Sequence, residues 1–179
     1  PASLFTNGST GGGHQMKINK ASSGDTASLL FQSGWNGRAE MGLAGNDSFS
    51  IKTANGGGAW TTALTISGEG YVSMPARPLA RAGRAAGNVS HAAGSTSGFT
   101  SLPIQQGGIA LGNIVTDTLK ELRVPVSGLY SVTLSLAVVT SSGHSVAIRI
   151  NGTATPFAIN GTNSSANSLQ SASFIIALN

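Results

Sequence analysis

The chain has 179 residues, and only 9% of them are charged, compared with about 25% in an ordinary soluble domain. It contains no cysteine, which excludes disulfides, thiol nucleophiles and thiolate metal sites. No apolar run approaches the length of about 20 residues that a membrane-spanning helix needs, so we expect no membrane insertion. Because so few charges give little repulsion between copies, we expect partner subunits to cover much of the surface.

The positive charge of the chain is local. The formal net charge is +4, and three of the ten Lys and Arg residues, Arg77, Arg81 and Arg84, fall in one short stretch. Proteins that bind nucleic acid usually carry a broad basic stripe, or basic residues interleaved with aromatic ones. Neither occurs elsewhere in the chain, so the sequence does not favour nucleic acid as a partner.

Short strands are predicted over the first half of the chain. Residues 1–13 end in a glycine run and are expected to form a flexible segment. From residue 14 to residue 74, alternating apolar and polar stretches recur about every ten residues, separated by clusters of Gly, Asn, Asp and Ser that suit tight turns. The predicted strands are "QMKIN" (15–19), "SLLFQS" (28–33), "RAEMGLAG" (38–45), "SFSIKTA" (48–54), "ALTIS" (63–67) and "YVSM" (71–74). The pattern predicts an all-β meander.

Residues 75–98 have a different character. They contain two prolines followed by Ala, Gly, Arg and Ser, with no periodic apolar face. A short helix is disfavoured there because Gly83 and Gly87 each cost about 1 kcal/mol relative to Ala. We therefore predict a linker over this range.

Longer and more apolar strands are predicted over residues 99–179. Within 130–138, Val132, Leu134, Leu136 and Val138 share one face, and Ser131, Thr133 and Ser135 share the other. We expect this strand to pair with 145–150 through a turn at 140–144. The chain ends one residue after the apolar run "FIIAL", which predicts a truncated domain or an edge completed by another chain.

Residues able to do chemistry are few and scattered. The six carboxylates are Asp25, Glu40, Asp47, Glu69, Asp117 and Glu121. A glycosidase needs two carboxylates flanking one bond, but Asp117 and Glu121 are expected to face solvent or to pair with Lys120 and Arg123. The three histidines have no spacing that would place two imidazoles on one metal. We therefore predict no catalytic residue, no metal, no cofactor and no enzymatic activity.

Trp35 is the main candidate for binding. It lies in the apparent turn "GWNGR" beside Asn36 and Arg38, and sugar sites combine a flat apolar face with neighbouring hydrogen-bonding groups. The alternative is that Trp35 closes the end of a small β-core. Segments 140–144 and 159–167 are predicted to be exposed loops.

Three residues of these two segments complete the set of glycan-binding candidates. They are His144, Asn160 and Asn163.

The segment from about Asn19 to Met74 resembles tail-fibre and host-adhesion proteins of phages, prophages and gene transfer agents. The resemblance lies in "SLLFQ", "GRAEMGLAGND" and "W..AL.IS.EGYV". It implies a virion fibre or spike, extracellular after release, that engages a host polysaccharide of the capsule or envelope.

Residues 99–179 resemble, more loosely, the trimeric jelly-roll heads of complement-type and tumour-necrosis-factor-like proteins. The resemblance lies in "LGN" (111–113), "VPVSGLY" (124–130) and "RING" (149–152), although Ser131 and Val132 replace the usual second aromatic residue. In that fold, a strand like "FIIAL" is followed by a Gly-Asp turn and further strands. The resemblance therefore implies a jelly-roll-like sandwich that is incomplete at its C-terminal end.

Together these patterns predict a β-rich unit, a linker and a jelly-roll-like head in a homotrimer that binds a surface glycan and other virion proteins. Three copies can bury apolar surface that one small unit would leave exposed. One alternative is a structural module that trimerises or attaches the fibre. The other is a tailspike that depolymerises polysaccharide.

Overall fold

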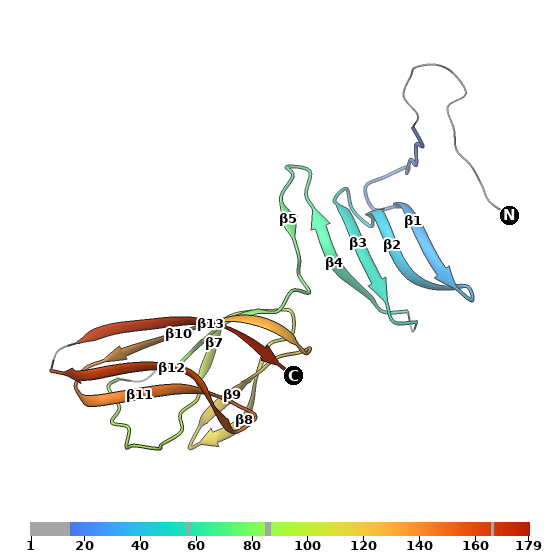
Figure 1. Cartoon of the computed structure of the whole chain (residues 1–179). Helices are drawn as coiled ribbons and strands as arrows, with labels where there is room; N and C mark the ends of the chain where they lie inside the picture. The colour runs from blue at the N-terminus through green and yellow to red at the C-terminus, as the bar shows by residue number, and fades with distance from the viewer. Residues whose placement is uncertain (1–14, 57, 85–86, 166) are drawn as a thin grey trace, which may run out of the picture. The chain divides into compact units, whose positions relative to one another are not determined.

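The computed structural model describes residues 15–56, 58–84, 87–165 and 167–179. Throughout these ranges the regular structure is β-strand and no helix occurs, which confirms the predicted all-β class (Figure 1). The segment 1–13, predicted to be flexible, lies outside the described residues. The chain divides into two compact units, Pro1–Arg77 and Pro78–Asn179.

The first unit is one antiparallel sheet in which each strand pairs with the next along the chain. Its strands are β1 (Thr26–Ser33), β2 (Asn36–Ala44), β3 (Phe49–Ala54), β4 (Trp60–Ile66) and β5 (Val72–Ser73). This is the meander that the sequence predicts over these residues.

The predicted first strand, 15–19, is the exception. These residues form no strand, because alternation alone supplies no neighbour with which to exchange hydrogen bonds. The following Lys20 instead anchors the turn between β2 and β3. Its Nζ donates to the carbonyl of Asn46 at 2.7 Å and lies 2.7 Å from the Asp47 carboxylate.

The sheet of the first unit has two chemically different faces. Residues paired directly across neighbouring strands point to the same face, so the register assigns each side chain to one of them. We call one of them the apolar face. It comprises Ala27, Leu29, Phe31, Ala39, Met41, Leu43, Phe49, Ile51, Leu64, Ile66 and Val72, together with the polar Thr53 and Thr61.

The opposite face carries the charged pair of the central strands, Glu40 and Lys52, which lie directly across from each other. Glu40 accepts a hydrogen bond from the Ser28 hydroxyl at 2.7 Å, and Lys52 Nζ donates to the Ala44 carbonyl at 3.0 Å. We call this side of the sheet the polar face. Glu40 and Lys52 therefore lie on one side of the sheet only, a side that Leu30 and Trp60 share.

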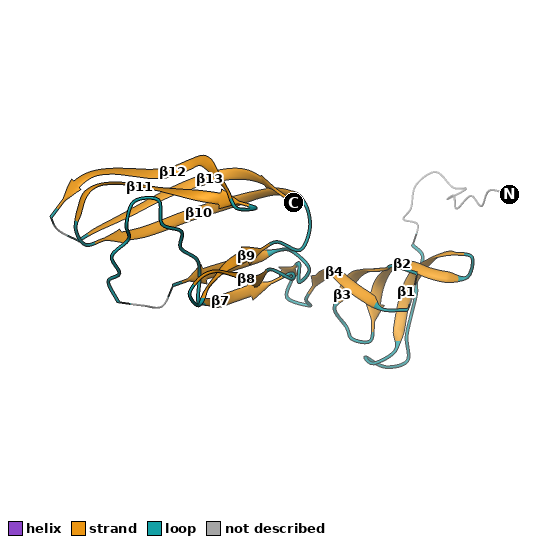
Figure 2. Cartoon of the chain, turned by 90° about the horizontal axis from the view of Figure 1, so that it is seen from below, coloured by secondary structure: helices purple, strands orange, loops and turns teal. Residues whose placement is uncertain are grey.

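The second unit is built from four antiparallel strand pairs: β6–β7, β8–β9, β10–β13 and β11–β12 (Figure 2). The strands are β6 (Leu79–Gly83), β7 (Ser101–Gln106), β8 (Ala110–Thr116), β9 (Leu119–Arg123), β10 (Gly128–Val138), β11 (Ser141–Ile150), β12 (Thr153–Ser164) and β13 (Ser168–Leu178). The β11–β12 pair is nested in sequence inside the β10–β13 pair.

The two nested pairs pack their inner faces together. Along β10, exposure alternates, and Val132, Leu134, Leu136 and Val138 lie on the less exposed face, which confirms the predicted sidedness. Phe157 of β12 contacts Phe174 of β13, with ring centroids 5.5 Å apart. Beside them Ile176 is only 2% exposed, so this unit has an apolar interior of its own.

The predicted partner of β10 is wrong. β10 pairs along its whole length with β13, and the segment 145–150 belongs to β11, which pairs with β12. Alternation fixes which side chains share a face but carries no information on which strand lies alongside. The same error produced the two predicted loops, because 141–144 lie in β11 and 159–164 lie in β12.

The range 75–98, predicted to be a linker, contains strand β6, and the two units divide between Arg77 and Pro78. β6 pairs with β7, for example Arg81 with Ile104. Small residues with little periodicity gave no strand signal there, and a partner about 20 residues further on supplies the missing hydrogen bonds. Residues 75–78 and 87–98 of this range lie in no strand.

Candidate functional site

The tip of the β1–β2 hairpin presents Trp35 to solvent. Gly34 and Trp35 form a two-residue loop with φ angles of 57° and 65°, which is the geometry of a type I′ turn. Gln32 Nε2 donates to the Trp35 carbonyl and Asn36 Nδ2 donates to the Gly34 carbonyl, both at 3.2 Å. Side-chain amides on both strands therefore hold the tip in shape.

The turn conformation does not favour a tryptophan at this position. Asn, Asp and Gly are the residues that suit a left-handed turn position, and a bulky side chain there costs on the order of 1 kcal/mol. Trp35 is also 91% exposed, so the alternative that it closes the end of a β-core is wrong for this unit. An exposed indole in a strained but well-fixed turn is suited to contact with a ligand.

The sequence groups Asn36 and Arg38 with Trp35. In the structure Asn36 lies at the hairpin tip, whereas the Arg38 side chain extends away from it. The Arg38 guanidinium lies against Gly56 in the turn after β3, where a Cβ atom would overlap with it. Trp60 lies over Gly37, beside Leu30, on the polar face of the sheet. Trp60 is therefore a packing residue, and the tip itself consists of Trp35 and Asn36.

The other three glycan candidates belong to the β11–β12 pair of the second unit. The His144 ring is half-buried, and its Nε2 donates to Gln170 Oε1 on β13 at 2.8 Å while its Nδ1 lies 3.0 Å from the Ser141 hydroxyl. Both ring nitrogens thus have partners inside the unit. Asn160 and Asn163 are exposed on β12. The two groups of candidates lie in different units.

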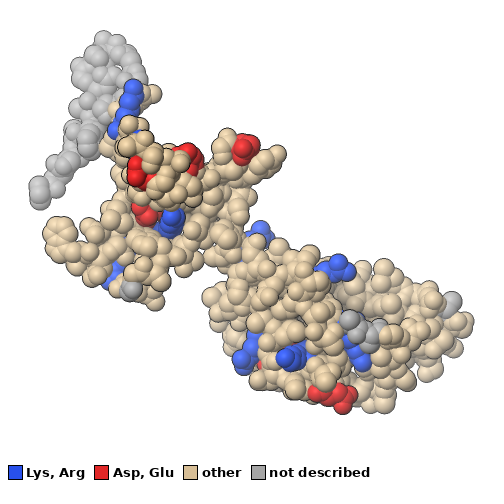
Figure 3. All heavy atoms as spheres, turned by 180° about the vertical axis from the view of Figure 1, so that it is seen from behind, with Lys and Arg blue, Asp and Glu red and all other residues tan. Residues whose placement is uncertain are grey.

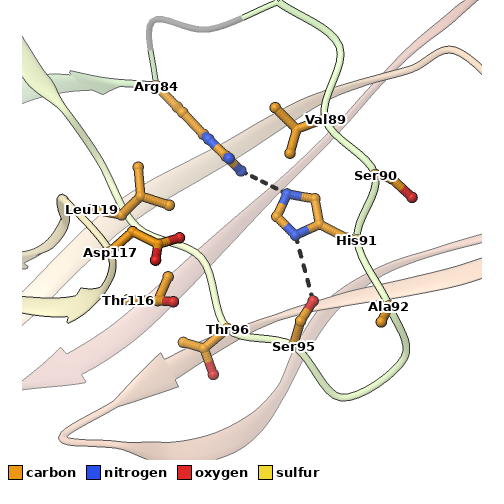
Figure 4. A pocket seen from close by; sticks show the side chains of 10 residues that line it. All are labelled: Arg84, Val89, Ser90, His91, Ala92, Ser95, Thr96, Thr116, Asp117 and Leu119. Carbon is orange, nitrogen blue, oxygen red and sulfur yellow. Dashed lines mark hydrogen bonds between the residues drawn. The ribbon is translucent and has the colours of Figure 1, made fainter.

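A small pocket in the second unit was not predicted from the sequence. It has a volume of about 190 Å³ and is lined by the segment after β6 and the β8–β9 turn (Figure 4). Its lining residues are Arg84, Val89, Ser90, His91, Ala92, Ser95, Thr96, Thr116, Asp117 and Leu119. This volume is below the range of about 300–1,000 Å³ typical of pockets for drug-sized ligands, so only a small polar molecule would fit.

A hydrogen-bond network fixes one wall of this pocket. Arg84 Nη1 donates to His91 Nε2 at 2.6 Å and to the Ser97 hydroxyl at 2.9 Å. Because arginine only donates, His91 Nε2 is the acceptor, and its Nδ1 faces the Ser95 hydroxyl at 3.4 Å. Arg84 therefore holds the segment after β6 in place, and the Asp117 side chain lies across the pocket from His91 (Figure 4).

Ionisable groups elsewhere mainly support turns. Glu121 pairs with Arg123 at 3.2 Å, one of the two arrangements predicted for it. The Ser67 hydroxyl, followed by the backbone of Glu69 itself, lowers the pKa of Glu69 in the turn before β5. Most of the surface seen in Figure 3 is uncharged, in line with the composition.

The part of the chain that the structure describes contains neither a metal-binding cluster nor a helix that could span a membrane. No cluster of three or more His, Cys, Asp or Glu side chains there could hold a metal ion. The same residues include no helix with the length and apolar character required to cross a membrane.

Comparisons of the chain with models of known protein families, with curated protein sequences and with solved structures find no significant match.

Proposed function

We propose that the protein is a homotrimeric fibre or spike component of a phage or phage-like particle that binds a host surface glycan without catalysis. The observation that carries the proposal is Trp35, 91% exposed at a left-handed position of a fixed hairpin tip. The adjacent Asn36 adds a side-chain amide. Indole stacking on the apolar face of a sugar ring is a common use of such an exposed aromatic group.

A trimer would make weak sugar contacts effective. One exposed tryptophan provides limited affinity, whereas linked copies raise the overall affinity by about 10² to 10⁴ without any new contact. The resemblance of 19–74 to host-adhesion fibres supports the same function. The nested pairing of β10–β13 around β11–β12 supports a rolled, jelly-roll-like head, since that fold is a long strand pair wound on itself.

One alternative has an observation of its own. The apolar face of the first unit supports self-association whether or not a glycan binds. The protein would then be a structural module that trimerises or attaches the fibre while another component recognises the host.

Binding of host polysaccharide to the purified protein separates these functions. Replacing Trp35 by Ala should weaken glycan binding at least about tenfold, or 1.4 kcal/mol, because the stacking surface is lost. Tyr71→Ala is the matched control, since Tyr71 is another exposed aromatic residue of the same unit, at 76%. Affinity is measured by calorimetry or surface plasmon resonance on trimeric protein.

Three outcomes count against the proposal. Absence of binding by the wild-type trimer favours the structural module, and shortening of the polysaccharide favours a depolymerase. Equal affinities of the wild-type and Trp35→Ala proteins would remove the hairpin tip as the binding site.

A further inference from the structure

We infer that the pocket of the second unit binds one neutral sugar unit, held by the Asp117 carboxylate and the Thr116 hydroxyl beside a wall that Arg84 positions. The pocket has a volume of about 190 Å³, which is room for about six water molecules at ~30 Å³ each and is comparable with the space that a single sugar ring and its hydroxyls occupy. The inference rests on the proposed function only for the source of this sugar, a host glycan. The site itself is separate from the hairpin tip at Trp35.

One wall of the pocket belongs to a segment without strands that two arginines hold. Arg84 Nη1 donates to His91 Nε2 at 2.6 Å. Arg149 of β11 donates from its Nη1 to the Thr96 hydroxyl at 3.0 Å. Residues 87–98 lie in no strand, so these side-chain bonds hold the segment where a ladder of backbone bonds would otherwise do so. A site fixed before its ligand arrives loses less entropy on binding.

The opposite wall offers hydrogen-bonding groups that are free to meet a ligand. Among the described residues, neither the Asp117 carboxylate nor the Thr116 hydroxyl has a hydrogen-bond or ion-pair partner. Asp117 has a φ of 48° in the two-residue turn between β8 and β9, and Asp suits such a left-handed position. The turn therefore explains the backbone of Asp117 and leaves its carboxylate free, across the pocket from His91 (Figure 4).

Arg84 itself is left with one unsatisfied donor. Its Nε is buried and has no hydrogen-bond partner among the residues that the structure describes. Buried polar groups in native proteins nearly always have a partner, and an ordered water or another bound group supplies it where the protein does not. This orphaned donor in a residue that lines the pocket is a second, independent sign that a polar molecule completes the site.

The charges of the lining residues favour a neutral ligand over an anion. Arginine only donates, so His91 Nε2 accepts from Arg84 and the imidazole carries its proton on Nδ1, which makes the ring neutral. The guanidinium and the Asp117 carboxylate then balance in formal charge, and the carboxylate would repel a phosphate or another carboxylate. A carboxylate that accepts, and a hydroxyl that both donates and accepts, are instead suited to the hydroxyl groups of a sugar.

Apolar side chains complete the match with a sugar. Val89 and Leu119 line the same pocket. A sugar ring has C–H groups on its faces as well as hydroxyls at its rim, so its site combines a few placed polar groups with an apolar lining. Water alone would gain nothing from these apolar side chains, whereas the C–H groups of a sugar ring bury against them.

Saturation-transfer NMR on the full chain tests the inference. The probes are the neutral monosaccharides glucose, galactose, mannose, rhamnose and N-acetylglucosamine, each at millimolar concentration because so small a ligand binds weakly. Inorganic phosphate, added as a competitor, tests the choice of a neutral ligand.

Three variants separate the pocket from the rest of the unit. Asp117→Gly removes the carboxylate and keeps a residue suited to the left-handed turn. Thr116→Val removes only the hydroxyl and keeps the strand propensity of β8. Asn151→Gly is the matched control, since Asn151 occupies a left-handed turn position of the same unit, with a φ of 50°, and does not line the pocket.

The expected result is saturation transfer from the wild-type protein to at least one of these sugars. Asp117→Gly should weaken this binding at least about tenfold, because a hydrogen bond to a charged group is lost, and Thr116→Val should weaken it about threefold. Asn151→Gly and Trp35→Ala should leave the affinity within about twofold of wild type. Circular dichroism follows the strands, and Thr116→Val decides the test if Asp117→Gly loses them.

Three results would overturn the inference: no saturation of any of the sugars, equal affinities of the wild-type and pocket variants, or displacement of the sugar by phosphate. A loss of binding in Trp35→Ala alone would also overturn it and would leave the hairpin tip of the proposed function in place. Binding that depends on Asp117 and not on Trp35 would support the pocket, whatever the polysaccharide titration shows for the tip.

Discussion

The two units of this chain differ in how many large apolar side chains they bury. The second unit packs two strand pairs against each other and buries five apolar side chains: Ile109, Leu119, Val138, Ile159 and Ile176. The first unit, in the residues described, is a single layer whose buried apolar side chains are Ala27 and Ala44. Strands of similar composition thus enclose large apolar side chains in the second unit and leave them partly or fully exposed in the first.

The largest expected effect within a single chain concerns the interior of the second unit. Ile176→Ala should lower the free energy of unfolding of that unit by about 2–5 kcal/mol, because it removes buried methyl groups and leaves a cavity. Both tryptophans, Trp35 and Trp60, belong to the first unit. Denaturant unfolding at one protein concentration should therefore shift part of the circular dichroism transition and leave the tryptophan fluorescence transition unchanged.

The neighbouring isoleucine is the control for this prediction. Ile175 is 73% exposed on the outer face of β13, so Ile175→Ala should change stability by less than about 0.5 kcal/mol. Equal losses for the two variants would contradict the assignment of inner and outer faces. They would then place the outer face of β13 in an interface.

A smaller effect is expected at His144, which links the two strand pairs of the second unit. His144→Ala removes the hydrogen bonds to Gln170 and Ser141, and it should cost about 1–2 kcal/mol of stability, since each such bond contributes about 1 kcal/mol. Glycan affinity should not change, because both ring nitrogens are already used within the unit. The measurement pairs denaturant unfolding with glycan titration of the same variant.

Asn163→Ala is the comparison for that experiment, because Asn163 is an exposed candidate on β12. It should leave stability within about 0.5 kcal/mol of wild type. A loss of glycan affinity in His144→Ala without loss of stability would restore His144 as a contact residue, as the sequence suggested.

Most of the strands could be predicted from the sequence, because side-chain alternation is a local signal. Alternation along residues 130–138 fixed the faces of β10 correctly. It could not identify the partner strand, since Thr133 and Ser173 bond across 40 positions of the chain, and such pairing is decided by tertiary packing. Residues 15–19 show the converse. Their side chains alternate as in a strand, but no neighbouring strand pairs with them and they form no strand.

The candidate site was predictable to a similar degree. The cluster "GWNG" marked Trp35 as a turn residue, and its exposure follows from the two-residue loop. The Arg38 side chain lies against Gly56 in another turn, and no local sequence pattern reveals this contact. The pocket beside Arg84 was missed because it joins the irregular segment after β6 to the β8–β9 turn, a contact that no local pattern reveals.

The smallest effect is expected in the turn before β5, at the edge of the open sheet. Ser67 accepts a hydrogen bond from the Tyr71 amide at 3.3 Å, and its hydroxyl also lowers the pKa of the exposed Glu69 from its ordinary value. A carboxylate with a lowered pKa contributes stability that is present above its unfolded pKa and is lost as pH falls through the folded pKa. When followed by NMR, Glu69 should therefore titrate below the usual range of a glutamate, and Ser67→Ala should raise its pKa towards that range. Because Glu69 is exposed, Glu69→Gln should change stability less than His144→Ala does, and only above about pH 4. A titration midpoint of Glu69 that is the same with and without the Ser67 hydroxyl would show that this hydroxyl does not lower the pKa of Glu69.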